Sequence, residues 1–312
     1  MRRARWQAVA VLLIGAASAV RAREERISPA KESPAAVLAE ADRHYAARDA
    51  GRTGARANPR EISEAISLYE RAGEGPEAHW KLARALYFLG SYTGLDENAQ
   101  RAVFERARRA GEEAVRSVGA RRGSADPRKL GPSSATDVFR KDPDAPAALF
   151  WTAVAWGQWS LASGKMEAAR KGAARRIRDD CLTVIALDPA FEEGGGYRIL
   201  GRVHDQAPKI PLLTGWVSRA EGLRLLRLAI EQAPRNFVNR HFLAEALARS
   251  GAFAEAIKIE EGLTSDKPGT EHVVEELSIQ EAARKNLAAW RSRGGRLAPD
   301  GGRPAPVSPP DP

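Results

Sequence analysis

Apolar residues recur along most of the chain at intervals of three and four positions, the spacing that gathers them on one face of an α-helix. Glycine and proline interrupt this pattern repeatedly, and each interruption predicts the end of a helix. Alanine and arginine are abundant while runs of β-branched residues are scarce, which favours helix over strand. We therefore expect helices over residues 34–49, 61–72, 98–118, 147–163, 168–187, 192–206, 219–233 and 273–291.

One of these predicted helices carries a repeat signature. Tyr197, Leu200, Gly201 and His204 follow the spacing of the first helix of a tetratricopeptide hairpin, except that histidine stands where tyrosine is usual. Leu200 and His204 lie one turn apart on the same helix face. Gly201 has no side chain, so we expect the paired helix to approach closely at this position.

A fuller repeat follows nearer the C-terminus. The interval from Pro234 to Pro268 is 34 residues, which is the tetratricopeptide period. Within it, Leu243, Ala244 and Leu247 occupy the large, small and large positions of the first helix. The sequence therefore predicts an all-α fold, a tetratricopeptide-like superhelix of helical hairpins (an α-solenoid), which the helix at 273–291 closes.

Changes in composition divide the chain into five segments. Residues 1–22 have the layout of a signal peptide, and 23–118 are expected to form N-terminal helical repeats. Residues 119–146 are rich in glycine and proline, which predicts a long loop, either an insertion or a lid. Residues 147–293 are expected to form C-terminal tetratricopeptide-like repeats, and 294–312 a disordered tail.

The first segment indicates where the protein functions. A basic start precedes an apolar run over 8–17, and small residues then offer cleavage sites at 17–19 and 20–22. The apolar run is short for a membrane-spanning helix, which favours a cleaved signal peptide. The alternative is that the segment is not cleaved and serves as a membrane anchor. Cys181 is the only cysteine in the sequence, so the anchor residue of a bacterial lipoprotein is missing. We expect an exported, periplasmic protein in which Cys181 is a small buried hydrophobe.

The net charge does not point to nucleic acid. The formal charge is +9, and removal of four arginines in the targeting segment (Arg2, Arg3, Arg5 and Arg21) lowers it to +5. The most basic stretch, 101–129, nearly lacks aromatic residues, which opposes stacking on single-stranded nucleic acid. We therefore expect no nucleic-acid partner.

No residue pattern in the sequence indicates catalysis, a metal site or a cofactor. The five histidines lack the close spacing of a zinc motif. The glycine run 194–196 has no preceding strand and no following Lys-Ser/Thr, so a helix-entry turn is the better interpretation. The adjacent glutamates 112–113 and 260–261 diverge by about 100° on a helix, and we expect them on solvated faces. We predict that the protein is not an enzyme.

Candidate binding residues come from two helices that should be successive first helices of the repeats. Repeat arrays bind on the concave face, which first helices line. Aromatic walls with one or two cationic donors would suit a ligand with an apolar body and an acidic end. The alternative for each residue is that its side chain packs against a neighbouring helix or belongs to a solvent-exposed stripe. The candidate ligand- or partner-binding residues are Trp156, Trp159, Tyr197, Arg198 and Arg202.

Three stretches together resemble a known family. FWTAVAWGQW at 150–159, CLTVIALDPAFEEGGGYRILGRVHDQAPKIP at 181–211 and SRAEGLRLLRLAIEQAPRNFVNRHFLAEALA at 218–248 resemble the TatT-like T-components of tripartite ATP-independent periplasmic (TRAP) transporters. The resemblance covers roughly residues 146–290. Members of this family often carry a lipid-anchor cysteine, which this sequence lacks.

The resemblance implies a function. It implies a non-catalytic periplasmic helical-repeat protein that acts as a binding or adaptor component of a TRAP-type solute uptake system. Its expected partner is a periplasmic substrate-binding protein, and its expected ligand a small apolar or acidic molecule held in a channel. The alternative is a general tetratricopeptide scaffold for envelope protein assembly, with another envelope protein as partner. Whether the chain forms a homo-oligomer stays open.

Overall fold

The computed structural model describes residues 33–124 and 126–294, and its regular structure there is helical apart from one isolated bridge between Thr53 and Arg56. The expected signal peptide (1–22) and nearly all of the expected tail (294–312) lie outside the described residues. The first half contains α2 (Pro34–Ala46), α3 (Pro59–Arg71), α4 (Pro76–Tyr92), α5 (Glu97–Arg121), the 3-10 helix η1 (Pro127–Leu130), α6 (Pro132–Phe139) and α7 (Ala145–Ser163). The second half contains α8 (Lys165–Arg170), α9 (Ala173–Leu187), α10 (Phe191–Gln206), α11 (Arg219–Gln232), α12 (Phe237–Arg249), α13 (Phe253–Ser265) and α14 (Val273–Gly294).

Asparagine side chains cap the starts of two helices, α3 and α12. Asn58 Oδ1 accepts a hydrogen bond from the Arg60 backbone N–H at 3.0 Å at the start of α3. Asn236 Oδ1 accepts one from the Asn239 N–H at 2.9 Å at the start of α12. Each satisfies a backbone donor that the first helical turn leaves unpaired.

Successive helices pack as hairpins: α2 with α3, α4 with α5, α7 with α9, α10 with α11, and α12 with α13. Gly201 on α10 faces Gly222 on α11, where a Cβ on Gly201 would lie 2.8 Å from Leu226 Cγ and 3.1 Å from the Gly222 carbonyl oxygen. The close approach predicted at Gly201 is therefore confirmed. Together with the all-helical content, this pairing confirms an all-α, tetratricopeptide-like array.

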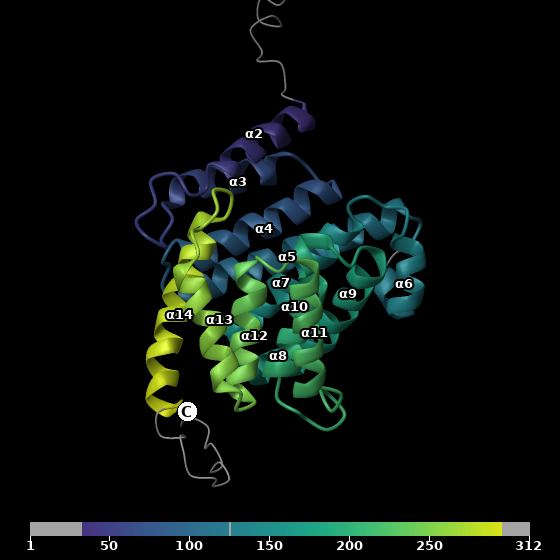
Figure 1. Cartoon of the computed structure of the whole chain (residues 1–312). Coiled ribbons are helices and arrows are strands. Elements are labelled where there is room, and N and C mark those ends of the chain that lie inside the picture. The colour runs from purple at the N-terminus through teal and green to yellow at the C-terminus, as the bar shows by residue number, and fades with distance from the viewer. Residues whose placement is uncertain (1–32, 125, 295–312) are drawn as a thin grey trace, which may run out of the picture.

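The first helices of the hairpins form the inner layer of the array. α4 contacts α7, α7 contacts α10, α10 contacts α12, and α12 contacts α14. Helix α14 also contacts α4, so the last helix of the described chain lies beside an early one (Figure 1). These inner helices therefore close into a ring, with α5, α9, α11 and α13 packed against them as the partner helices.

The segment 119–146, which we expected to be a long loop, is largely folded. α5 extends to Arg121, and η1 and α6 follow within the segment. Pro127 and Pro132 occupy the first turns of these short helices, where proline is favourable because the missing N–H needs no partner. Phe139 on α6 is 1% exposed, and α6 packs against α9. The prolines that predicted a loop are thus helix starts.

The connection between α10 and α11, residues 207–218, is ordered by its own contacts. Thr214 Oγ1 accepts a hydrogen bond from the Ile210 N–H at 2.9 Å, and the rings of His204 and Trp216 meet edge to face. Leu212 has a φ of 67°, and it and Leu213 are exposed at the tip. Among the described helices, none combines the length and apolar character needed to cross a membrane.

Candidate functional site

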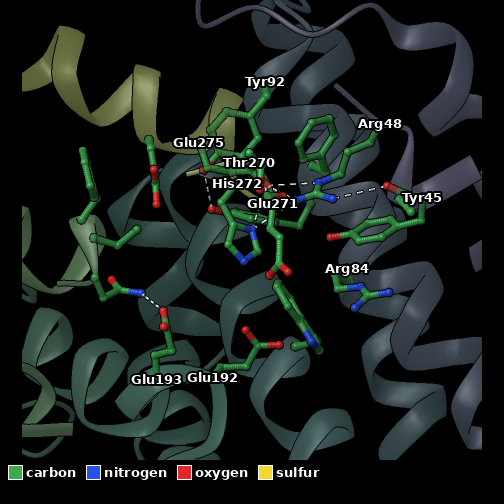
Figure 2. A pocket seen from close by; sticks show the side chains of 18 of the residues that line it. Tyr45, Arg48, Arg84, Tyr92, Glu192, Glu193, Thr270, Glu271, His272 and Glu275 are labelled. Carbon is green, nitrogen blue, oxygen red and sulfur yellow. Dashed lines mark hydrogen bonds and ion pairs between the residues drawn. The ribbon is translucent and has the colours of Figure 1, made fainter. Parts of the chain in front are cut away.

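A cavity of about 510 Å³ lies on the inner side of the array, lined by residues of α2, α4, α7, α10, α12 and α14 and of the segments beside them (Figure 2). All of these helices except α2 belong to the inner ring described above. The volume lies within the range of about 300–1,000 Å³ found for small-molecule sites. The inner helices therefore surround a partly open pocket of ligand size.

Arg48 closes this cavity between the two ends of the described chain. It follows α2 and is 6% exposed. Its Nη2 donates to Glu275 Oε1 at 2.9 Å and to the Glu271 carbonyl oxygen at 2.5 Å, and it lies 3.1 Å from His272 Nδ1, while its Nε donates to Glu275 Oε1 at 3.2 Å. Burial opposes ionisation of Glu275, but hydrogen bonds from His272 and Arg48 outweigh it and lower the carboxyl pKa.

An unusual turn at the start of α10 forms another wall. Glu192, Glu193 and Gly194 have φ values of 48°, 57° and 79°, so two non-glycine residues adopt the left-handed conformation. Asn239 Nδ2 donates to the Glu193 carbonyl oxygen at 2.9 Å, and Arg198 Nη1 donates to the Glu192 carbonyl oxygen at 3.2 Å. Arg198 also donates to Asn239 Oδ1 at 2.9 Å. The helix-entry turn expected here is confirmed, and buried polar contacts hold it.

Aromatic side chains form much of the remaining lining. The rings of Tyr87 and Trp151 lie 5.9 Å apart, and the hydroxyls of Tyr87 and Tyr92 lie 3.1 Å apart. Burial raises the pKa of Tyr45, Tyr87 and Tyr92 above the ordinary value, so all three phenols are neutral at neutral pH. The tyrosines therefore offer ring faces and hydroxyls rather than charge.

Three lining residues carry buried polar atoms without a hydrogen-bond partner. These atoms are Arg84 Nε, Trp151 Nε1 and Glu275 Oε2. The Arg84 guanidinium lies 3.9 Å from the centre of the Tyr45 ring. Trp151 is only 9% exposed. A buried polar group without a partner is costly, so the cavity wall retains donors and an acceptor that a polar ligand or water could satisfy.

Four of the five predicted binding residues do not line the cavity, and two of these are the tryptophans of α7. Trp156 and Trp159 are 4% and 6% exposed, and their rings meet edge to face at 5.3 Å. Trp156 Nε1 donates to Glu112 Oε1 at 2.5 Å, and the Arg108 guanidinium lies 4.8 Å from the Trp156 ring centre. Both tryptophans pack within an apolar cluster between helices, rather than on the concave surface where we expected them.

The other three candidates lie on different faces of α10. Tyr197 is half-buried and packs against the same apolar cluster as the tryptophans. Arg202 forms an ion pair with Glu245 and lies 4.2 Å over the Phe242 ring. Arg198 alone among the five lines the cavity. Successive residues diverge by about 100° around a helix, so neighbours in sequence meet different surroundings and do not form one wall.

Two glutamates expected on solvated faces instead form ion pairs, Glu112 partly buried and Glu260 fully buried. Glu112 lies between Arg128, whose Nη2 is 2.6 Å from Oε2, and Arg176, whose Nη1 is 3.1 Å from Oε1. Glu260 is fully buried, with Oε1 3.0 Å from His241 Nδ1. Charged residues tolerate burial when they are paired, which a single sequence does not reveal. Within residues 33–124 and 126–294, no cluster of histidine, cysteine, aspartate or glutamate could hold a metal ion.

Most of the cavity residues had no signal in the sequence. Arg48 lies at the end of the helix predicted over 34–49, and its partner Glu275 is 227 positions away. Trp151 was not among the candidate binding residues. The one usable signal is the pair Glu192–Glu193 before the glycine run, because a turn there places their side chains at a helix start.

Comparison with known proteins identifies no family. No family model matches the sequence, and no curated protein matches it. A solved structure, "TPR2AB-domain:pHSP90-complex of yeast Sti1", aligns with 83% of this chain and 98% of its own at 15% sequence identity and a TM-score of 0.30. The assignment of a tetratricopeptide-like array therefore rests on the hairpin pairing and the Gly201–Gly222 contact.

Proposed function

We propose that this is a non-catalytic, exported binding protein that holds a small solute within its ring and serves as the adaptor of a TRAP-type uptake system. Export is supported by the basic start and short apolar run of the first segment. The uptake role is supported by the family resemblance of the stretches around FWTAVAWGQW and GGGYRILG. The expected partner is a periplasmic substrate-binding protein.

The observation that carries the proposal is the closed ring around the cavity. An open superhelix offers an extended concave groove that suits a polypeptide. Here the contacts from Arg48 to the segment before α14 bridge the groove and leave a compact, partly open cavity of about 510 Å³. Its mixed lining of aromatic rings and a few polar groups is typical of small-molecule sites.

Mass spectrometry of natively purified protein tests this function. We expect a small molecule of defined mass to be released on denaturation. Val238 lines the cavity, so Val238→Trp should fill it and abolish the signal. Leu182 on α9 is 40% exposed and does not line the cavity, so Leu182→Trp is the matched control that should retain the ligand. A parent protein that releases nothing, or a Val238→Trp variant that retains the ligand, would reject the proposal.

A scaffold for envelope protein assembly is the second candidate, and the loop between α10 and α11 favours it. Leu212 and Leu213 are exposed at the tip of this ordered loop, and exposed apolar residues in fixed positions are common in protein interfaces. Cross-linking in the native host separates the two. A scaffold should cross-link to assembly machinery through the loop, and Leu212→Ser with Leu213→Ser should remove that cross-link without affecting bound solute.

A further inference from the structure

The cavity is lined by charges of both signs. Acidic residues outnumber basic ones, which argues against the acidic ligand that the family resemblance implies. A carboxylate in the cavity would gain from the arginines but would be repelled by more glutamates. The lining includes three arginines, Arg48, Arg84 and Arg198, and five glutamates, Glu192, Glu193, Glu271, Glu275 and Glu276.

Several of these charges are already engaged by the protein. Arg48 and Glu275 pair with each other, and Arg198 donates to Asn239 and to a backbone carbonyl. The Glu193 carboxylate accepts a hydrogen bond from the Asn236 side chain, and Glu276 Oε2 accepts one from the Gly269 N–H at 2.5 Å. A ligand would have to break these contacts to use the same groups.

Three charges remain available to a ligand. Within the described residues, no carboxylate lies within ion-pair distance of Arg84, and its Nε has no hydrogen-bond partner. The side chains of Glu192 and Glu271 likewise make no hydrogen bond or ion pair to the described part of the chain; only their backbone carbonyls are used, by Arg198 and Arg48. One cation and two anions in the described part of the chain are thus left without an ion-pair partner, although the Arg84 guanidinium lies 3.9 Å from the centre of the Tyr45 ring and also interacts with the Tyr69 hydroxyl.

These three side chains come from different walls of the cavity. Figure 2 shows Arg84 beside Tyr45 on one side, Glu192 beside Glu193 on another, and Glu271 reaching in from the segment before α14. The cation therefore sits at one side and the anions at others. Trp151 adds a second unpaired donor, since its Nε1 is buried and without a partner.

We infer that the cavity binds a small zwitterion, with its ammonium group at Glu192 and Glu271 and its carboxylate at Arg84. The inference rests on the proposed function, because it names the ligand class of the same cavity. Carboxylates favour an ammonium group through charge-assisted hydrogen bonds, and the neutral tyrosine rings add cation–π attraction. Arg84 can hold a carboxylate through its planar guanidinium. An amino acid or a close analogue has both groups.

The backbone at Glu192 agrees with this assignment. A side chain in the left-handed conformation costs about 1 kcal/mol that glycine would avoid. The chain nevertheless places glutamates at both 192 and 193 and holds the turn with Arg198 and Asn239. A strained turn that presents an unengaged carboxylate to a cavity is typical of a ligand contact.

Binding of matched probes tests the inference on the mature, full-length protein. The probes are the proteinogenic L-amino acids, each beside the amine that lacks its carboxylate and the acid that lacks its amino group; phenylalanine, phenethylamine and 3-phenylpropanoate form one such set. We expect at least one amino acid at millimolar concentration to raise the melting temperature. Calorimetry should then show both of its counterparts to bind at least tenfold more weakly.

Variants assign the two ends of the ligand. Glu192→Gln should weaken binding of the amino acid and of its amine by at least tenfold. Arg84→Gln should weaken binding of the amino acid but not of the amine. Arg84→Lys should restore part of the affinity for the amino acid. Glu64 on α3 is exposed and remote from the cavity lining, so Glu64→Gln is the control that should bind like the parent.

The inference fails if no amino acid binds, if an acid binds as tightly as its amino acid, or if Glu192→Gln binds like the parent. These outcomes are distinct from failure of the proposed function. Release of a solute without an amino group in the mass spectrometry described above would leave that function intact and reject only the zwitterion.

Discussion

Arg48 and Glu275 are 227 positions apart in sequence, yet their side chains meet at 2.9 Å and close the inner ring of helices. The two side chains are 8% and 15% exposed, so the ion pair is shielded from solvent. It joins the end of α2 to the first turn of α14 and encloses the cavity on that side. The pair is thus a structural link between the ends of the array as well as a wall of the site.

Loss of this link should open the ring. Arg48→Gln leaves the shielded Glu275 carboxylate without its cation, which costs on the order of 3 kcal/mol in the free energy of unfolding. Hydrogen exchange should show faster opening of α14, while α7 and α9 change little. Arg106→Gln, which removes an ion pair to Glu70 with both side chains about half exposed, is the control and should cost less than about 1 kcal/mol. Equal losses would show that Arg48 has no special role.

The contact between α10 and α11 should not tolerate a methyl group. In Gly201→Ala the new Cβ would lie 2.8 Å from Leu226 Cγ, so overpacking should destabilise the protein by about 1–3 kcal/mol. At Gly157 on α7 no atom lies within 4 Å of the corresponding position, so Gly157→Ala should stabilise by up to about 1 kcal/mol through helix propensity. Urea denaturation measures both, and effects of the same sign would contradict the packing.

A buried aspartate should make stability depend on pH. Asp180 on α9 is fully buried, and burial, opposed by Arg128 and reinforced by Glu112, raises its carboxyl pKa to about 7. The unfolded value is about 4. Between these values the folded state keeps a proton that the unfolded chain releases, so stability should fall as pH rises from about 4 to 7, by on the order of 4 kcal/mol, and then level off.

Asp180→Asn isolates this effect, because asparagine has a similar size and no charge. The variant should be more stable than the parent at pH 8 and close to it at pH 4.5, with a flatter profile between. Asp137 on α6 is exposed, so Asp137→Asn should keep the profile of the parent. Thermal melts across this range measure all three proteins. A parent whose stability rises from pH 4.5 to 8, with Asp180→Asn parallel to it, would refute the assignment.

Trp159 should contribute to stability. From the sequence we placed Trp159 among the candidate binding residues, but its side chain is 6% exposed within an apolar cluster. Its removal should cost about 3–5 kcal/mol. Leu161 on the same helix is 73% exposed, and Leu161→Ala should change stability by less than about 0.5 kcal/mol. Circular dichroism melts would show an error in this packing if the two variants behaved alike.

Export can be tested independently of the fold. Cleavage at 17–19 or 20–22 predicts a mature N-terminus near residue 20 or 23. N-terminal sequencing of protein from the native host gives the answer, and intact Met1 in a cytosolic fraction would contradict it.

The sequence was sufficient to predict the helical hairpins but not the closure of their inner helices into a ring. The periodicity that predicts helices, and the small residue at Gly201, depend on local spacing and on contact between adjacent helices, which sequence encodes directly. Arg48 and Glu275 meet only because the hairpins before them turn through a full ring, so no short pattern indicates their pairing. Trp156 and Trp159 were wrongly assigned to the concave surface. The sequence shows that a helix has an apolar face, but not which neighbouring helix covers that face.

The ring closure also limits how this architecture can change by duplication. An open repeat array can gain or lose a hairpin at little cost, because each hairpin touches only its neighbours. In this protein the contact between α4 and α14 requires the intervening hairpins to complete one turn. One additional hairpin would carry α14 past Arg48, and one fewer would leave it short. We therefore expect related arrays to diverge by substitution within a constant number of repeats.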